Sequence, residues 1–333
     1  MPVLTRRATL ALTAAATTTA LGMRATGAQA QGVWAPSRPI RLVVPFSGGG
    51  ATDVTARILG EGLSAKLGQP VVIDNRPGAG GTIGADVVAK SDPDGHTLLM
   101  CTIGTASINR YLYTRLPYNP DTDLVPVANA NAVANGIMVH PTAMPAQDFQ
   151  AFIALAKANP GKFNYATPGN GTSGHMCGEL LKAKAGIDIG HVPYRGSATI
   201  MADLLAGRVE LSVDNLPAYL PHIRENRLRI LAVTSKDRWF AVPQTPTIME
   251  SGIPGFEAVA WFGVQAPGGT PQPILDRIGG LILEICRDPV TASRFHELGA
   301  EPMPLGPTEF AAWIASENEK WQEVVRVSGA SLN

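Results

Sequence analysis

Apolar residues follow two different spacings along the chain, and together these spacings predict an α/β fold. The first unit opens with the apolar run Ile40-Arg41-Leu42-Val43-Val44, which is typical of a buried strand. A glycine-rich turn follows, and apolar residues such as Val54 and Ile58 then recur at helical spacing until Gly68 ends the helix. The run Val71-Val72-Ile73 predicts the next strand.

The same order of elements returns about 120 residues later. Residues 162–166 predict a strand, residues 167–174 form a polar glycine loop, residues 175–185 predict a helix, and residues 191–194 predict a second strand. Each unit is therefore strand, glycine loop, helix and strand. We expect parallel strands joined by a right-handed helical crossover in both units.

Further strands and helices alternate through the rest of the chain. Strands are expected at 97–101, 136–139, 211–213, 230–233 and 262–264, and helices at 147–158, 198–206, 272–287, 289–298 and 307–328. Such alternation predicts layered, mostly parallel sheets covered by helices. The length of 333 residues suggests about two domains.

The composition excludes two broad classes of protein. Lysine and arginine total 27 and aspartate and glutamate total 27, while 45% of residues are hydrophobic and only 16% are charged. A disordered chain would need more charge and less apolar surface. A nucleic-acid-binding protein would need a basic excess to neutralise phosphates, and none is present.

The first 30 residues have the pattern of an export signal. Arg6 and Arg7 precede an uncharged run, and Ala28-Gln29-Ala30 is a small-x-small cleavage signature. The paired arginines also resemble a twin-arginine signal, so both export routes remain open. Cleavage after Ala30 would remove three arginines and no acid, leaving a soluble chain with a net charge of −3. The leader looks bacterial, so we expect the mature protein in the periplasm.

The two glycine loops predict sites for anions. A glycine loop between a strand and a helix exposes several main-chain N–H groups, and the helix N-terminus adds a partial positive charge. In the first loop we expect Thr52 to be the N-cap and Asp53 to lie in the first helical turn. Two opposed loops would suit a ligand with an anionic group at each end, although either loop alone could be just a tight turn.

Motifs that would indicate a specific enzyme or a metal site are matched only in part or not at all. Residues 169–174 fit the dinucleotide pattern G-x-G-x-x-G, but Tyr194-Arg195 stands where an acidic residue is expected. A serine hydrolase would need G-x-S-x-G, and the segment around Ser173 lacks the last glycine. The six histidines form no metal-binding pair, and the three cysteines are expected to be buried small hydrophobic residues that form at most one disulfide.

Two further residues have more than one interpretation. Asp214 follows a strand and could accept a hydrogen bond from a ligand or hold loop amides, and the second role is favoured because an aspartate would repel a carboxylate ligand. His175 could touch the ligand or only support its loop.

A series of short motifs, in a fixed order, resembles one family. The first are 39–46 (PIRLVVPF), 49–53 (GGATD), 67–70 (LGQP), 75–81 (NRPGAGG) and 93–99 (PDGHTLL). They continue with 158–162 (ANPGK), 191–196 (HVPYRG), 246–247 (PT), 261–263 (WFG) and 266–267 (AP). Over residues 39–330 the chain resembles the Bug family, the periplasmic solute receptors of tripartite tricarboxylate transporters.

The resemblance implies a type II periplasmic binding protein, with two α/β domains, a hinge and a ligand cleft between them. Domain one would comprise residues 37–137 plus 259–333, and domain two residues 138–258. In this family one ligand carboxylate is held by main-chain amides and ordered waters. The implied ligand-binding residues are Phe46, Gly49, Gly50, Thr52, Asp53, Thr167, Gly171, Thr172 and Ser173, with His175 and Asp214 nearby. Gly48 replaces the proline that is usual in this loop and should make it more flexible.

The resemblance also implies a function without covalent chemistry. The protein would be a monomeric receptor that closes on a small carboxylate (a di- or tricarboxylate, an amino dicarboxylate or an aromatic carboxylate) and delivers it to membrane transporter subunits. No catalytic residue, cofactor, metal or nucleic-acid partner is expected. The alternatives are an exported enzyme such as a hydrolase, and a receptor that reports to a sensor protein.

Overall fold

The computed structural model describes residues 34–332. The described residues from Ala35 onward form one compact unit. The expected signal peptide and its cleavage site after Ala30 lie outside the described residues.

The strands of this unit belong to one hydrogen-bonded sheet. Their bounds are β1 (Ile40–Val44), β2 (Val71–Asn75), β3 (Thr97–Thr102), β4 (Leu124–Val139), β5 (Asn164–Thr167), β6 (Gly190–Pro193), β7 (Leu211–Asn215), β8 (Arg229–Val233), β9 (Val259–Pro267) and β10 (Glu301–Leu305). The neighbour order is β2-β1-β3-β9-β4-β7-β5-β6, and β8 and β10 also pair with β4.

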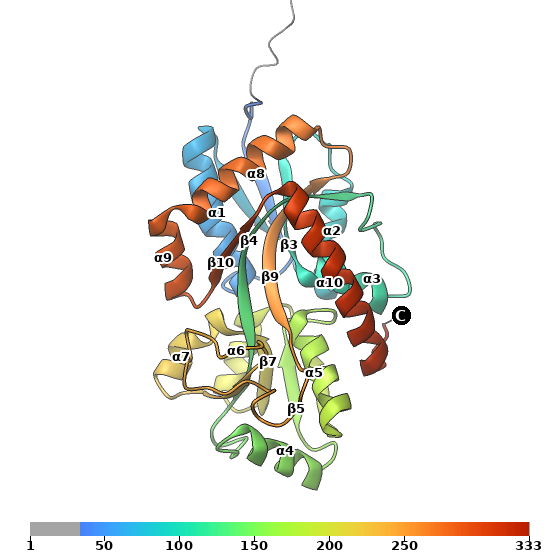
Figure 1. Cartoon of the computed structure of the whole chain (residues 1–333), viewed down its shortest axis with the longest axis vertical. Coiled ribbons are helices and arrows are strands. Elements are labelled where there is room, and N and C mark those ends of the chain that lie inside the picture. Colours follow the sequence, from blue (N-terminus) through green and yellow to red (C-terminus); the bar gives the residue numbers. More distant parts are fainter. Residues whose placement is uncertain (1–33, 333) are drawn as a thin grey trace, which may run out of the picture. The chain divides into compact units, whose positions relative to one another are not determined.

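Helices cover both ends of this sheet (Figure 1). The α-helices are α1 (Ala51–Leu67), α2 (Thr82–Ala89), α3 (Asn109–Leu112), α4 (Phe149–Ala158), α5 (Ser173–Ala185), α6 (Ser197–Leu205), α7 (Leu220–Arg224), α8 (Gln272–Arg287), α9 (Pro289–Glu297) and α10 (Pro307–Ser328). Single helical turns of other types are η1 (Ala79–Gly81), η2 (Gly104–Ile108) and η3 (Leu216–Ala218).

Both predicted strand–loop–helix–strand units form. Strand β1 leads through α1 to β2, and the two strands pair in parallel from Ile40 with Val71 to Val44 with Asn75. Strand β5 leads through α5 to β6, again in parallel. Gly68 and Gly186 end their helices in the left-handed conformation, as the sequence predicted, because glycine adopts positive φ without a Cβ clash.

The expectation of mostly parallel sheets is wrong, because β4 and β9 introduce antiparallel pairing. The pairs β3–β9, β4–β9, β4–β10, β4–β7 and β4–β8 are all antiparallel. Strand β4 first pairs with β9, as far as Ala134, and from Asn135 onward it pairs with β7. It therefore runs from the group of elements around α1, α8 and α10 into the group around α5 and α6, beside β9 (Figure 1).

Several elements are absent from the sequence prediction. Helices α2 and α7 and strand β10 lie in segments where no clear periodicity was assigned, and β4 begins 12 residues before the predicted Gly136. Buried asparagines such as Asn129 and Asn131 interrupt the apolar pattern in the first half of β4. The side-chain amide N–H groups of both have partners in other segments: Asn129 donates to the Met303 carbonyl (3.0 Å) and Asn131 to the Thr55 hydroxyl (3.0 Å).

The C-terminal helix α10 is fixed to the sheet through one buried carboxylate. Glu317 accepts hydrogen bonds from the indole N–H groups of Trp261 in β9 (3.1 Å) and Trp321 in α10 (3.0 Å). A buried polar group needs such partners to offset the loss of water. Cys101, Cys177 and Cys286 are free and buried, as expected for small apolar residues.

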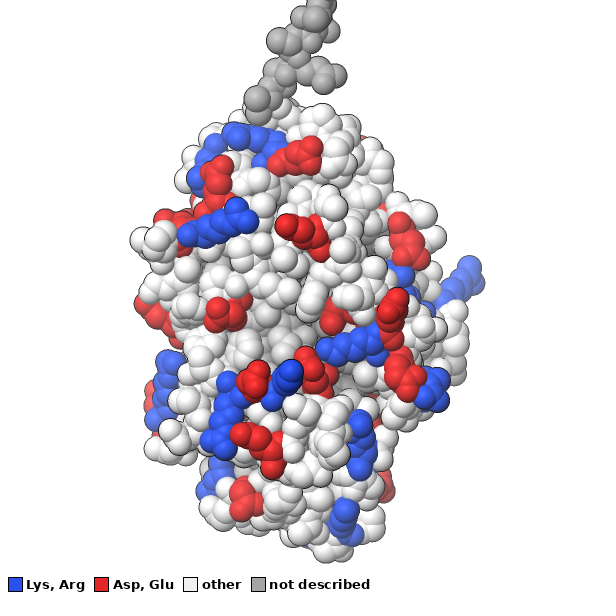
Figure 2. All heavy atoms as spheres, in the orientation of Figure 1, with Lys and Arg blue, Asp and Glu red and all other residues white. Residues whose placement is uncertain are grey.

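The surface carries no large region of one charge on the face shown in Figure 2, where Lys and Arg alternate with Asp and Glu. Exposed ion pairs of the described residues include Arg38 with Asp94 and Arg326 with Glu323. Within residues 34–332, no helix has the length and apolar character needed to cross a membrane.

Candidate functional site

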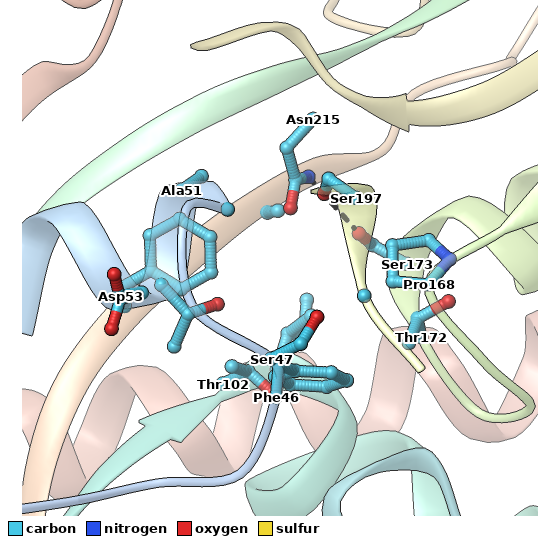
Figure 3. Close-up of a pocket in the computed structure, with 16 residues that line it drawn as sticks. Phe46, Ser47, Ala51, Asp53, Thr102, Pro168, Thr172, Ser173, Ser197 and Asn215 are labelled. Carbon is cyan, nitrogen blue, oxygen red and sulfur yellow. Dashed lines mark hydrogen bonds between the residues drawn. The ribbon is translucent and has the colours of Figure 1, made fainter. Parts of the chain in front are cut away.

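A small cavity, called here the inner cavity, lies where the ends of several strands meet (Figure 3). The volume open to the centres of water molecules is about 30 Å³. Its lining residues are Phe46, Ser47, Gly50, Ala51, Thr52, Asp53, Thr102, Ile103, Pro168, Thr172, Ser173, Gly196, Ser197, Asn215, Ala260 and Phe262. They come from the first glycine loop, the ends of β3 and β7, the second glycine loop, the start of α6, and β9.

The N-terminus of α1 opens into the inner cavity. The N-cap is Gly50, so no side chain caps this helix end. The first hydrogen bond of the helix runs from the Val54 N–H to the Gly50 carbonyl (3.0 Å). The N–H groups of the first turn have no acceptor within a helix. Gly50, Ala51 and Thr52 line the cavity, so this helix end presents donors and a partial positive charge to it.

The structure corrects the expected N-cap, because Thr52 lies within the first turn and Gly50 is the cap. Asp53 lies in the first turn as predicted, but its carboxylate is turned away from the centre of the cavity (Figure 3). It accepts from the Gly49 N–H (2.9 Å), the Asn75 amide (3.0 Å) and the Arg57 guanidinium (2.9 and 3.1 Å). Burial disfavours the charged form, yet these hydrogen bonds together hold the pKa of Asp53 below its usual value. Asp53 therefore braces the first loop.

A second uncapped helix N-terminus, that of α6, faces the first. Its N-cap is Gly196, which makes no side-chain capping bond, and Ser197 begins the helix. A Cβ added to Gly50 would lie 3.3 Å from the Ser197 hydroxyl, so the two helix ends are in contact. The Ser47 N–H donates to the Arg195 carbonyl (3.1 Å) and joins the first loop to this turn. Gly196 has a φ of +143°, and a Cβ there would lie only 2.2 Å from the Ser47 hydroxyl.

The second predicted glycine loop contributes side chains to the cavity. Thr172 is the N-cap of α5, and its hydroxyl accepts from the His175 N–H (3.3 Å), so this helix end is partly satisfied by its own cap. The Ser173 hydroxyl donates to the Asn135 side-chain oxygen (2.9 Å), and the Asn215 amide donates to the same oxygen (2.8 Å). This network holds Ser173 and Asn215 at the wall of the cavity.

Gly49, Thr167, Gly171 and His175 are expected site residues that do not line the inner cavity. The Thr167 hydroxyl contacts the His191 ring nitrogen (2.7 Å), and the Gly171 N–H donates to Nδ1 of His175 (3.2 Å). His175 also stacks on His191, with 4.2 Å between ring centroids. Burial lowers the pKa of His175 to about 4 and, with the neighbouring His175 ring, that of His191 to about 3. This geometry supports the loop-holding interpretation of His175.

Asp214 also lies behind the cavity wall, where it is 1% exposed. It accepts from the Tyr219 hydroxyl (2.8 Å), from the Asn215 N–H (2.7 Å) and from the Ser197 hydroxyl. Burial raises its pKa to about 6, against the opposing effect of these hydrogen bonds. Asp214 thus orients Ser197 and Asn215, which do line the cavity.

The sequence prediction missed some residues of the inner cavity. Those from segments that it did not place at the site are Thr102, Ile103, Gly196, Ser197, Ala260 and Phe262. Asn215 was missed although its neighbour Asp214 was a candidate. The turn at Arg195-Gly196 between a strand and a helix was a visible signal for Ser197. Ala260 and Phe262 carried no local signal, because only the folding of β9 across the sheet brings them to the cavity.

The inner cavity has little formal charge. Asp53 is its only ionisable lining residue within the described chain, and that carboxylate is paired with Arg57. No lysine, arginine or histidine of residues 34–332 lines it. In the same part of the chain no three His, Cys, Asp or Glu side chains cluster in a way that could hold a metal ion.

A hydrolase arrangement is not formed at Ser173. Its hydroxyl donates to an asparagine, whereas Nδ1 of His175 accepts from the Gly171 N–H. A nucleophilic serine needs a base within hydrogen-bond distance of its own hydroxyl. The Ser173 and His175 side chains do not provide that pairing.

Comparison with known proteins identifies the family. Residues 55–330 match the model of the tripartite tricarboxylate transporter family receptor. The chain belongs to this family. It is 42% identical over 308 residues to the "UPF0065 protein in tcbD-tcbE intergenic region" of Pseudomonas sp. (strain P51), covering 92% of this chain and 91% of the relative.

Solved structures agree with this assignment. A Rhodopseudomonas palustris protein determined with adipate has a TM-score of 0.86 and 38% identity, covering 89% of this chain and 99% of its own. The periplasmic binding protein BugD has a TM-score of 0.85 and 34% identity, covering 89% and 99%. The resemblance to the Bug family and the predicted type II binding-protein fold are therefore confirmed, and this family member is a solute-binding protein.

Proposed function

We propose that this receptor captures a small carboxylate in the periplasm and delivers it to a membrane transporter, without chemical change of the ligand. The observation that carries the proposal is the meeting of two uncapped helix N-termini, those of α1 and α6, in one cavity without a cation. Main-chain N–H groups at a helix N-terminus bind carboxylates well, because the donors and the helix dipole act in the same direction.

One side chain in the cavity also lacks a partner that a ligand would supply. The Ser47 hydroxyl is buried and makes no hydrogen bond within the described residues. Because a buried polar group without a partner is unfavourable, a ligand oxygen at this point would restore the missing bond. Ser47 is in contact with the α6 end at Gly196 and lines the same cavity as Gly50, so one ligand oxygen there would lie close to both helix ends.

The cleft would open by a hinge between the two proposed domains, residues 37–137 plus 259–333 and residues 138–258. Strand β4 changes its pairing partner between Ala134 and Asn135, which supports a crossing of the chain from one proposed domain to the other at this point. Strand β9 starts beside it at Val259. The inner cavity is small, so a ligand larger than a carboxylate group would enter an open form and be enclosed on closure.

A thermal-shift screen against carboxylates tests this function most directly. The mature chain should be stabilised by at least one small di- or tricarboxylate, amino dicarboxylate or aromatic carboxylate, and the ligand should be recovered unaltered. Stabilisation by neutral sugars or cations alone, or turnover of a substrate that Ser173→Ala abolishes, would contradict the proposal. Export is tested separately by N-terminal sequencing of the periplasmic protein, and delivery by uptake measurements with the reconstituted transporter.

A further inference from the structure

A second hollow adjoins the inner cavity. Its volume is about 390 Å³, far more than that of the inner cavity. The two share Phe46 and Pro168 as lining residues, so these two rings stand between them. We call this second space the outer hollow. Its other walls are the loop around Gly78–Gly80, Ile83, and the segment Pro193–Arg195.

Arg195 is the only charged residue among those that line the outer hollow in the described structure. Its side chain is exposed and makes no ion pair or side-chain hydrogen bond within residues 34–332. The other nearby cations are neutralised locally: Arg76 pairs with Asp74 (2.9 Å) and Arg57 with Asp53 (2.9 Å).

The nearest acid on the following helix is also occupied. Asp203 accepts from the Tyr194 hydroxyl (2.8 Å) and forms an ion pair with Arg208 (3.0 Å). Arg195 therefore keeps an uncompensated positive charge at the entrance of a cavity that itself contains no cation.

The main chain of Arg195 ties this charge to the ligand site. Its carbonyl accepts the Ser47 N–H (3.1 Å), and the next two residues, Gly196 and Ser197, line the inner cavity. The guanidinium is thus carried on the same turn that brings the α6 N-terminus against the first loop. A ligand held by one end in the inner cavity and longer than that cavity would extend past Phe46 and Pro168 into the outer hollow.

We propose that Arg195 binds a second anionic group of the ligand at this entrance and thereby makes the receptor selective for dicarboxylates over monocarboxylates of the same chain length. This inference rests on the proposed carboxylate-binding function. A guanidinium forms paired, charge-assisted hydrogen bonds with a carboxylate, and these bonds are stronger than those between neutral groups.

The test is isothermal titration of linear α,ω-dicarboxylates of four to eight carbons and of the monocarboxylates of equal length. The wild type is compared with Arg195→Ala, Arg195→Lys and the control Arg326→Ala, which removes an exposed cation on α10. We expect Arg195→Ala to weaken dicarboxylate binding at least about tenfold while changing monocarboxylate binding less than about threefold. Arg195→Lys should recover part of the loss, and Arg326→Ala should leave the selectivity unchanged.

Other results separate this inference from the proposed function. Equal weakening of both ligand types by Arg195→Ala, no weakening of either, or a wild type that binds only monocarboxylates or aromatic carboxylates would overturn the role of Arg195 and leave carboxylate capture standing. A wild type that binds no carboxylate in the series or in the wider thermal-shift screen would overturn both. Melting curves of the variants confirm that each is folded before titration.

Discussion

At the scale of single residues, the site depends on glycines and on polar side chains that brace the main chain. Asp53, Asp214 and His175 were all candidate site residues, with a loop-holding role favoured for Asp214 and left open for His175. In the structure each accepts a hydrogen bond from a main-chain N–H group. The sequence predicts that these residues belong to the site, but it does not show which way their side chains point. A side chain in a loop can point either way until its neighbours in other segments are placed.

Gly50 tests the main-chain binding model directly. Gly50→Val should weaken carboxylate binding at least about tenfold, because its side chain would meet Ser197 and block the donors at both helix ends. Its φ of −84° is open to valine, so the loss in the free energy of unfolding should stay near 1 kcal/mol. Titration calorimetry and urea unfolding measure the two effects. The control is Gly280→Val, since a Cβ at Gly280 meets no atom within 4 Å. Unchanged affinity in folded Gly50→Val would contradict the model.

The buried His175 should lower the free energy of unfolding of the protein in acid. Its pKa is about 4 in the folded protein, because of burial, against an ordinary value of 6.5. The unfolded chain therefore takes up this proton first, so the contribution of His175 is complete above pH 6.5 and is lost as the pH falls toward 4. In this range the contribution of His175 to the free energy of unfolding falls by about 1.4 kcal/mol per pH unit. Asp214, whose pKa is raised to about 6, acts in the opposite direction between pH 3.8 and 6.

His175→Phe keeps an aromatic ring and removes the titration. Between pH 6 and 5 its free energy of unfolding, measured by urea denaturation, should depend less steeply on pH than that of the wild type, by about 1 kcal/mol per unit. An identical slope in the two proteins would show that burial of His175 does not hold it neutral.

At the scale of elements, the sequence predicted the helices and short strands with regular spacing and failed where polar residues are buried. Helices α8 and α10 have the predicted bounds, since their apolar residues repeat over four or more turns. Strand β4 was predicted only over its last four residues, because buried asparagines interrupt the apolar pattern earlier in the strand. Their amide groups donate hydrogen bonds to β10 and α1. That compensation involves segments remote in sequence.

The contact between the first loop and the start of α6 predicts a specific effect of Gly196. Gly196→Ala should weaken ligand binding at least about tenfold, because its Cβ would collide with the Ser47 hydroxyl and hold the two helix ends apart. Gly186→Ala is the matched control: Gly186 also has positive φ (+62°), but a Cβ there meets no atom within 4 Å. Both variants should lose stability in urea unfolding, and only Gly196→Ala should lose affinity in calorimetry. Equal losses of affinity in the two variants would show that the contact between Gly196 and the first loop is not needed for binding.

At the scale of the whole molecule, binding and folding are linked. A ligand that binds only the folded protein should raise its free energy of unfolding by about 2.7 kcal/mol at 100 times the Kd. Urea unfolding with increasing ligand should follow this relation, and Gly50→Val should show a reduced effect at the same ligand concentration. Stabilisation that levels off at ligand concentrations well above the Kd would indicate that the ligand also binds the unfolded chain.

The sequence by itself determined the family, the two strand–glycine loop–helix–strand units and the helix ends at Gly68 and Gly186, because motifs, hydrophobic spacing and glycine conformation are local properties. Only the tertiary structure decided that α6 rather than α5 opposes α1, and that Ala260 and Phe262 reach the cavity. It also decided that Arg195 stands at the entrance without a partner. These features depend on how β4 and β9 join distant segments, and no local pattern in the chain encodes that pairing.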